Sequence, residues 1–506
     1  MTAKGVIFDL VAVQSPSYRG RGIARYSFEL ARVMARRYPE LVTAMVVHPE
    51  LEEAPELAEL DRWVTTSPDW DAAGVLHLSS VMEPEVPVRT FWPAQATRHR
   101  LLTAVTLYDV IPDLFPGWYL QDPGLRRRWR CCREVVRAAD LVFTISESTA
   151  EDAVALLGIP ENRVSVIGTG TPPVFRPPSS RHEALQVALQ GVEGLEPGFI
   201  LYNGAFDPRK NIDRLVQGYA ALPAEVVGAH QLVIACAAPA LTRNHYLVMA
   251  RDLGVDGRVL ITGFVPEEVL VALDQTADLC VFPSLYEGYG MPVIEALACG
   301  TPAIAGDNSS LRELLPREAR FRPEDPLAIA EAITRALCDE GHRARLLEIA
   351  GRRPPSWDEV ADRAAPAFED LLRQASSHPR AWRRRPHLGL VGVPDNVVGA
   401  LGGAATYDAH PWPPAAPWAF ARNAAWQGGY DTVVVMPTAA DPAEAELEET
   451  LAAIAAAAHG RCLVLTSSET PQHVTGAAVQ LGLVTADATD EGVTGTILDM
   501  ARRSGP

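Results

Sequence analysis

The sequence predicts an α/β protein with two Rossmann-like domains that face a cleft, followed by a small α/β module. Two observations predict the pair of domains: short apolar runs alternate with helical stretches twice along the chain, and a Pro- and Ser-rich connector at Thr171–Ser180 separates the two series. The third observation is the composition after residue 387, where alanine and glycine dominate. The predicted units are an N-terminal domain at 1–175, a second domain at 190–356, a helix at 357–374 packing back towards the N-terminal domain, a basic linker at 375–387 and an acidic module at 388–506.

Six apolar runs predict the strands of the N-terminal domain. Each is short and nearly continuous in apolar residues, which is typical of parallel strands buried on both faces. Helical periodicity at Ala24–Arg37 and Leu125–Ala139 predicts helices between them. The predicted strands are Gly5–Val13, Thr43–Val47, Val75–Leu78, Leu102–Tyr108, Leu141–Ile145 and Val164–Ile167.

The second domain and the module are predicted in the same way. An amphipathic stretch at Trp357–Gln374 predicts a helix, and the basic, Trp-bearing segment Pro379–Pro386 marks a domain boundary. Within the module, Val398–Gly429 is predicted to be a loop without a site. The strands predicted for the second domain are Phe199–Asn203, Gln231–Ala235, Val259–Thr262, Leu279–Phe282 and Ala303–Ala305. Those predicted for the module are Leu388–Val391, Thr432–Met436 and Cys462–Thr466, with a helix at Glu444–Ala458.

Composition excludes several classes of function. The 506 residues carry a net charge of −18, which argues against nucleic acid as the main partner because phosphate binding needs a positive surface. Asp9 interrupts the N-terminal apolar run, and no run reaches about 18 apolar residues, so we expect a cytoplasmic protein. The seven cysteines lack CxxC spacing, which fits reduced thiols rather than a disulfide or zinc framework.

The segment Phe282–Ile304 carries two glutamates, Glu287 and Glu295, eight positions apart. Glu287 is predicted in the loop at the carboxyl end of a buried strand. Glu295 is predicted in the first turn of the following helix, where free backbone N–H groups would face a phosphate. This arrangement is typical of a nucleotide-sugar site. The structural alternative is a capping and salt-bridge pair at an acidic helix start.

Lysine is almost absent from the chain, which contains only Lys4 and Lys210. Lys210 lies beside Arg209 in a turn that follows a strand and Gly204. Cations at the carboxyl end of a parallel strand lie next to the ligand that the cleft binds. The ammonium of lysine is a compact point charge on a flexible stem, and the planar guanidinium of arginine cannot replace it. The alternative is that the position of Lys210 is due to chance.

These segments together resemble the retaining glycosyltransferases of family 4, which have the GT-B fold. The resemblance covers roughly residues 1–375, and its pattern is closest to bacterial polysaccharide mannosyl- or rhamnosyltransferases. The stretches that carry it are the DPRKN turn at Asp207, TGFVPEEVLVAL from Thr262, ADLCVFPSLYEGYGMPVIEALACGTPAIA from Ala277 and FRPEDPLAIAEAI from Phe321.

The resemblance implies transfer of a hexose from a nucleoside-diphosphate sugar, with retention, to a hydroxyl of a glycan, a lipid-linked glycan or a small molecule. Glu295 would hold the ribose, Glu287 the sugar and its reacting face, and Lys210 with Arg209 the departing diphosphate. No metal or cofactor is then required besides the donor substrate. The remaining residues implied at the donor are Gly204, Gly288, Tyr289, Gly290, Met291, Ser309, Ser310 and Leu311.

The N-terminal domain is expected to bind the acceptor. Gly20 and Gly22 lie in a loop that would approach the donor phosphates or the acceptor, although a plain turn is the alternative. Tyr108 and Asp109 match the family's His-Asp element, with tyrosine in place of histidine, and Asp109 would orient the acceptor. Many members carry an arginine where this chain has Ala205, and Arg209 would then supply the missing charge.

Further candidates lie outside these motifs. His77 is a candidate acceptor-side residue, and the alternative is a hydrogen-bonded core histidine. The basic stretch Arg126–Arg133 would contact an anionic membrane at the inner face, or else form a solvated helix face. The module 388–506 is a candidate for binding a protein partner. The alternative to an enzyme is a non-catalytic nucleotide-sugar-binding or scaffolding protein on the same frame.

Overall fold

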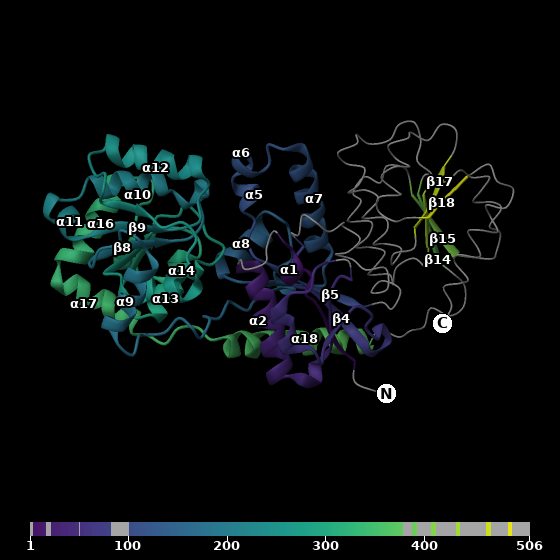
Figure 1. Ribbon diagram of the computed structural model, residues 1–506. Helices are drawn as coiled ribbons and strands as arrows, with labels where there is room; N and C mark the ends of the chain where they lie inside the picture. The colour runs from purple at the N-terminus through teal and green to yellow at the C-terminus, as the bar shows by residue number, and fades with distance from the viewer. Residues whose placement is uncertain are drawn as a thin grey trace.

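The computed structural model describes residues 4–16, 22–49, 51–81 and 101–377 and the five strands of the C-terminal module (Figure 1). Gly20, the segment Pro379–Pro386 and the predicted helix Glu444–Ala458 lie outside the described residues. No helix in the described part of the chain is long and apolar enough to cross a membrane.

The first domain is built on a seven-stranded parallel sheet in the order β3-β2-β1-β4-β5-β6-β7. Its strands are β1 (Gly5–Asp9), β2 (Val42–Val46), β3 (Val64–Thr65), β4 (Ala73–Leu78), β5 (Leu102–Leu107), β6 (Leu141–Thr144) and β7 (Val164–Val166). Reading outwards from β1, this is the doubly wound order of a Rossmann-like domain, as predicted. The short edge strand β3 was not predicted, because two residues carry no periodic signal.

Helices cover both faces of this sheet. They are α1 (Val11–Gln14), α2 (Gly22–Arg37), α5 (Ile111–Leu114), α6 (Pro116–Tyr119), α7 (Pro123–Ala138) and α8 (Glu147–Ala155), with short 3₁₀ helices η1 (Pro39–Leu41), η2 (Pro55–Leu60), η3 (Trp70–Ala72) and η4 (Glu161–Arg163). One apolar core lies beneath α2, and a second lies on the opposite face beneath α7 and α8.

The first strand is shorter than predicted, because the chain turns at Asp9. The Asp9 carboxylate accepts a hydrogen bond from the Val11 N–H at 3.1 Å, and the residues that follow form α1. Residues 10–13 are fully buried all the same. The apolar run in the sequence includes α1 as well as β1, because both are buried. The prediction of a strand as far as Val13 was therefore wrong.

The second domain repeats the same order, β10-β9-β8-β11-β12-β13, in a six-stranded parallel sheet. Its strands are β8 (Phe199–Asn203), β9 (Gln231–Ala235), β10 (Val259–Ile261), β11 (Leu279–Phe282), β12 (Ala303–Gly306) and β13 (Arg320–Phe321). Its helices are α9 (Arg181–Gly191), η5 (Pro208–Lys210), α10 (Ile212–Ala220), α11 (Ala224–Ala229), α12 (Ala240–Asp252), α13 (Glu267–Thr276), α14 (Met291–Ala298), α15 (Leu311–Leu314), η6 (Arg317–Ala319), α16 (Pro326–Cys338) and α17 (Glu340–Ala350). Both predicted Rossmann-like domains are therefore present.

Helix α18 (Trp357–Ser377) follows the second domain but packs on the first, along its lower side in Figure 1. The Trp357 ring lies edge-on to Tyr26, with 5.1 Å between ring centroids. Phe368 is fully buried against Phe8 on β1, and the Arg363 guanidinium donates to the carbonyl of Ile167 at 2.9 Å. The chain thus crosses between the domains twice.

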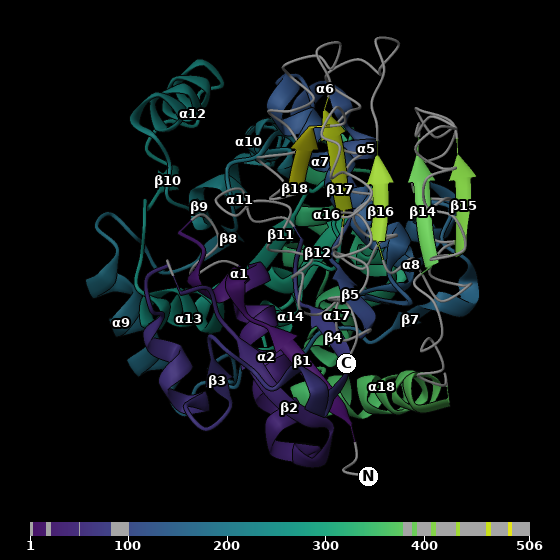
Figure 2. The same ribbon diagram turned by 90° about the vertical axis from the view of Figure 1, so that its right-hand side faces the viewer.

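The C-terminal module contains a third parallel sheet, in the order β15-β14-β16-β17-β18 (Figure 2). Its strands are β14 (His387–Val391), β15 (Thr406–His410), β16 (Thr432–Val435), β17 (Cys462–Thr466) and β18 (Val484–Asp487). β15 falls within Val398–Gly429, so the prediction of a loop there was wrong. β15 is an edge strand with polar residues in its sequence, and a search for apolar runs does not detect such a strand.

Candidate functional site

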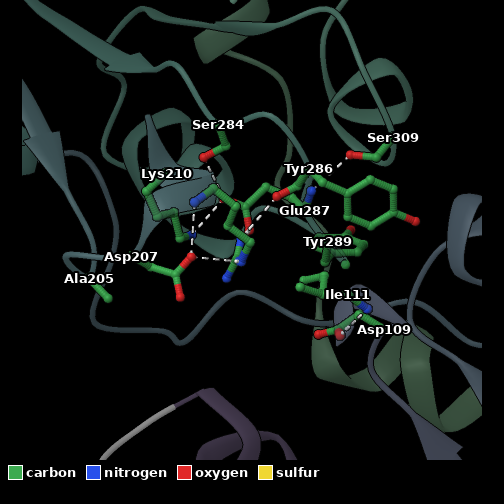
Figure 3. A network of polar contacts seen from close by, with 12 residues as sticks. Asp109, Ile111, Ala205, Asp207, Lys210, Ser284, Tyr286, Glu287, Tyr289 and Ser309 are labelled. Atoms are coloured by element: carbon green, nitrogen blue, oxygen red, sulfur yellow. Dashed lines mark hydrogen bonds and ion pairs between the residues drawn. The ribbon is translucent and has the colours of Figure 1, made fainter. Parts of the chain in front are cut away.

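The predicted cations and Glu287 meet at the carboxyl ends of β8 and β11, the two central strands of the second sheet (Figure 3). Lys210 ends η5, which follows β8, and Glu287 lies in the loop between β11 and α14. Successive connections leave these adjacent strands in opposite directions. This is the switch point at which open parallel sheets bind their ligands.

Local hydrogen bonds fix the loop that carries the cations. The Asp207 carboxylate accepts from the Arg209 N–H at 3.1 Å and so caps η5. Asn211 adopts a left-handed conformation, with φ of 61°, and its amide donates to the carbonyl of Pro283 at 3.0 Å. The Leu285 N–H donates to the carbonyl of Arg209 at 2.7 Å. The two loops therefore form one unit.

Glu287 is the centre of a buried ionic cluster. Its Oε1 lies 2.6 Å from the Lys210 Nζ and its Oε2 lies 2.8 Å from the Arg209 Nη1. The Ser284 hydroxyl donates to Oε1 at 2.6 Å. Glu287 is 8% and Lys210 9% exposed. Burial alone would raise the pKa of Glu287, but the charges of Lys210 and Arg209 outweigh it and lower this pKa to about 2.

Two cations, Lys210 and Arg209, face Glu287 in this cluster, and Asp207 is a second carboxylate, 3.6 Å from the Arg209 Nε. Burial would lower the pKa of Arg209, but Glu287 and Asp207 raise it, so the guanidinium remains charged. Charges held in a buried site are screened little by solvent, and they act strongly on a diphosphate. The arrangement can therefore bind a diphosphate and stabilise the charge that develops on it during bond cleavage.

Glu295 lies one turn further along its helix than predicted. Gly290, with φ of 103°, is the N-cap, so α14 starts at Met291 and Glu295 is its fifth residue. The first turn is thus complete before Glu295. Its side chain is 7% exposed, and burial, only partly offset by Arg25, raises its pKa to about 7. The prediction that Glu295 occupies the first turn was wrong.

Arg25 is a residue at the site that the sequence did not identify. It lies on α2 of the first domain, and its Nη1 is 3.9 Å from the Glu295 Oε1. Its guanidinium also pairs with Glu267 at the start of α13. Arg25 follows Gly22 by three positions, but no spacing rule distinguished it from neighbouring arginines. Gly22, which was predicted, starts the same helix beside Met291.

Ser309 and Ser310 brace the Glu287 loop. The Glu287 N–H donates to the Ser309 hydroxyl at 2.9 Å, and the Ser310 hydroxyl donates to the carbonyls of Glu287 at 2.9 Å and Tyr289 at 2.7 Å. Leu311 is fully buried in the core of the second domain. Ser309 and Ser310 were predicted among the residues at the donor, and in this structure their hydroxyls hold the Glu287 loop.

Glycine is required at two predicted positions. Gly204 has φ of 151°, and a Cβ there would lie 2.8 Å from the Tyr202 hydroxyl oxygen. At Gly290 a Cβ would lie 2.8 Å from Leu311 Cδ2. Ala205, which replaces the family arginine, is exposed and brings no charge to the cluster.

Asp109 approaches the cluster from the first domain (Figure 3). Its carboxylate accepts from the Ile111 N–H at 2.9 Å and so turns the chain into α5. Burial raises the pKa of Asp109, although the Ile111 N–H and the Arg209 charge oppose the rise. The predicted Asp109 and the predicted cations therefore lie together although they belong to different domains.

Two acceptor-side predictions were wrong. The Tyr108 hydroxyl donates to the carbonyl of Ser79 at 2.8 Å and its ring packs edge-on against Tyr26, so the side chain points into the first-domain core. His77 is fully buried, and its Nε2 lies 2.9 Å from the Thr106 hydroxyl. Burial lowers the pKa of His77 to about 3. The core alternative for His77 was the correct one.

The two doubly wound domains, with the buried cluster at the switch point of the second, give this chain the GT-B fold. The fold is similar to that of sucrose-phosphate synthase from Thermosynechococcus elongatus, with 20% identity, a TM-score of 0.56 and coverage of 73% of this chain and 100% of that one. It is also similar to Anabaena Alr3699/HepE in complex with UDP, with 15% identity, a TM-score of 0.55 and coverage of 72% and 100%.

The family matches cover the two domains separately. Residues 20–174 match Glycosyltransferase Family 4, and residues 190–353 match Glycosyl transferases group 1. The two Rossmann-like domains of this chain therefore belong to the group 1 and family 4 glycosyltransferases.

Two curated relatives come from Escherichia coli. The serotype-specific mannosyltransferase WbdA is 31% identical over 277 residues, which are 54% of this chain and 34% of WbdA. The O-antigen chain mannosyltransferase B is 29% identical over 278 residues, which are 54% of this chain and 72% of that protein. The chain thus spans about a third of the length of WbdA.

Proposed function

We propose that this protein is a retaining, metal-independent glycosyltransferase that moves a hexose from a nucleoside-diphosphate sugar to an acceptor hydroxyl. The observation that carries the proposal is the buried cluster of Lys210, Arg209 and Glu287 at the switch point of the second domain. The mannosyltransferase relatives support a hexose as the transferred group. The acceptor is a glycan, a lipid-linked glycan or a small molecule, and the site of action is the cytoplasm, at the inner face of the membrane.

In the proposed reaction the bond between the anomeric carbon and the diphosphate oxygen breaks. The acceptor oxygen bonds to that carbon on the same face, and the departing diphosphate takes the acceptor proton. Lys210 and Arg209 hold the diphosphate as its negative charge grows, so they stabilise the transition state more than the ground state. Glu287 faces the sugar, Glu295 holds the ribose and Asp109 orients the acceptor. These cations supply the positive charge that a metal ion would otherwise supply.

Incubation of the full chain with a panel of nucleotide sugars and candidate acceptors tests the proposal. Transfer or slow hydrolysis of at least one hexose donor, with retention observed by NMR of the product, is the expected result. Absence of both, together with no nucleotide binding by calorimetry, contradicts it. Tight binding without turnover would instead establish the alternative, a non-catalytic nucleotide-sugar-binding protein on the same frame.

The raised pKa of Glu295 predicts a pH dependence of donor binding. An ionised carboxylate accepts hydrogen bonds from ribose hydroxyls more strongly than a neutral one. With a pKa of about 7 in the free protein, donor affinity should fall as the pH is lowered from 8 to 6. Glu295→Gln should bind more weakly at pH 8 and lose this dependence. Calorimetric titration with the nucleotide at both pH values is the measurement, and an unchanged affinity in the variant contradicts the ribose role.

Glu295 also affects stability in a predictable direction. Its pKa is higher in the folded state than the ordinary 4.5, so its stabilising contribution is present below about pH 4.5 and is lost as the pH rises through about 7. Relative to Glu295→Gln, the parent should lose stability between pH 5 and pH 8, by an amount on the order of 3 kcal/mol. Thermal melts of both proteins, with the exposed Glu318→Gln as control, measure the difference. A difference that does not change with pH contradicts this prediction.

For the membrane contact we propose a smaller surface than the sequence predicted. Arg133 pairs with Asp113 at 3.1 Å, and its charge is therefore satisfied within the domain. Trp118 is 46% and Leu125 53% exposed, next to the exposed Arg126. Aromatic and basic side chains at one surface suit an anionic interface. Vesicles of phosphatidylglycerol should bind the parent but not the double variant Trp118→Ala/Leu125→Ala. If this surface is only a solvated helix face, the vesicles should bind neither protein.

We further propose that the module 388–506 binds a protein partner. A chain truncated after Pro386 should keep transferase activity within about threefold and lose the partner in pull-down experiments. Insoluble truncated protein would instead show that the module completes the fold. Unchanged capture of the same partner would contradict the docking role.

A further inference from the structure

The loop that carries Glu287 is attached to the first domain. The carbonyl of Gly288 accepts hydrogen bonds from the Ser146 hydroxyl at 2.6 Å and from the Thr149 hydroxyl at 3.2 Å. Both side chains are almost completely buried and lie at the N-terminal end of α8. On the other side of Glu287, the Tyr286 hydroxyl is hydrogen-bonded to the Asp152 carboxylate of the same helix. Both chain neighbours of Glu287 are thus held by α8.

Glu313 makes a second attachment to this helix end. Its carboxylate oxygens accept from the backbone N–H groups of Glu147 at 3.0 Å and Ser148 at 2.8 Å, the first two residues of α8. These N–H groups have no acceptor within their own helix, and a carboxylate satisfies them well. Helix α15 begins directly after Ser309 and Ser310, the serines that brace the Glu287 loop from within the second domain, and Glu313 is its third residue. The N-terminal end of α8 therefore contacts both the Glu287 loop and α15, the helix that follows the bracing serines.

Gly288 shows how close the two domains are at this point. A Cβ at residue 288 would lie 2.4 Å from the carbonyl oxygen of Tyr108 and 3.2 Å from the Cβ of Asp109, both in the first domain. None of the three nearest atoms belongs to the second domain. A methyl group here would hold the domains apart without disturbing the donor domain itself.

We propose that Ser146, Thr149 and Glu313 are positioning residues, which make the geometry of Glu287 depend on closure of the two domains. When α8 docks, the residues on both sides of Glu287 are fixed, and Asp109 is brought to the same cluster. When the domains separate, the loop keeps the contacts made within the second domain, which are its serine braces and the bonds to Arg209 and Lys210, and loses those of Gly288 and Tyr286 to α8. Bond cleavage is thereby restricted to the closed state, where Asp109 and the acceptor are in place. This inference rests on the proposed transferase function.

Gly288→Ala tests the inference, and Gly228→Ala is its matched control. Gly228 lies in α11 of the same domain, and a Cβ there meets no atom within 4 Å. Gly288→Ala should bind nucleotide within about threefold of the parent and lose about a hundredfold in kcat, the order of loss that a misplacement of about 1 Å can cause. Gly228→Ala should match the parent in both. Parent-like kcat in Gly288→Ala overturns the inference, as does an equal loss of nucleotide binding and kcat.

Glu313→Gln supplies a second variant, at an exposed position. It should lower kcat about tenfold with little change in nucleotide affinity, whereas the exposed Glu318→Gln should have no effect. Small-angle scattering separates this inference from the proposed function. The parent should be compact with nucleotide bound and Gly288→Ala extended, whether or not transfer is detected. Identical scattering from the two proteins overturns the inference, while compaction without any transfer overturns only the proposed function.

Discussion

Lys210→Ala is expected to lower kcat/KM by a hundredfold or more, because loss of one preorganised group that stabilises developing charge costs a few kcal/mol. The Lys210 ammonium is buried and lies 2.6 Å from Glu287. With lysine removed, the Arg209 guanidinium alone faces the Glu287 and Asp207 carboxylates, so the site carries a net negative charge that opposes binding of the diphosphate. Initial-rate kinetics with the identified donor are the measurement.

Two comparisons make this prediction sharper. Lys4→Ala changes the other lysine of the chain, which lies just before β1, and should leave the kinetics unchanged. Lys210→Arg restores charge but not shape, because a planar guanidinium cannot take the place of a compact ammonium between Glu287 and the donor. We expect it to recover less than a tenth of the lost activity. Kinetics of Lys210→Ala within threefold of the parent would refute the role of Lys210.

Glu287→Ala is expected to cause a comparable loss of turnover but not of donor binding. The substitution leaves Lys210 and Arg209 buried without their carboxylate, and breaking a buried pair in this way typically costs about 3–5 kcal/mol of stability. A bound diphosphate can replace the missing negative charge, so nucleotide affinity should stay the same or rise while kcat falls about a hundredfold. Calorimetry and single-turnover rates distinguish the two effects. A parallel loss of affinity and kcat contradicts the assignment.

The pH dependence of stability gives Glu287 an independent test that needs no substrate. Its pKa of about 2 lies below the ordinary 4.5, so its stabilising contribution is present above about pH 4.5 and is lost as the pH falls towards 2. The melting temperature of the parent should therefore exceed that of Glu287→Gln at pH 6, and the difference should shrink at pH 3. A constant difference would show that the ion pairs do not stabilise the fold.

The cluster of Lys210 and Glu287 could be predicted although 77 positions separate these residues in the chain. Each follows a recognisable buried strand, and the carboxyl ends of parallel strands lie along one edge of a sheet. Wrong predictions arose where a local pattern ends without a clear signal. The apolar residues after Asp9 continue the pattern of a strand, and Gly290 places the start of α14 so that Glu295 falls outside the first turn.

Side-chain direction was the second source of error. Tyr108 and His77 both lie in or directly after strands that lead to the cleft, yet both point into the first-domain core, His77 against Phe368 of α18. A buried parallel strand is apolar on both faces, so its sequence does not show which face a given residue occupies. The position of α18, which arrives from the far end of the second domain, decides this.

The sequence by itself determined the two Rossmann-like domains and the cations and carboxylate of the donor side, because hydrophobic periodicity and parallel topology are enough to specify them. Only the tertiary structure decided how the first domain meets that site: Arg25 reaches Glu295, Asp109 joins the cluster and α8 holds Gly288. These contacts join two sheets that each have their own core. Their geometry depends on the packing of one domain against the other, for which no periodic pattern exists in the chain.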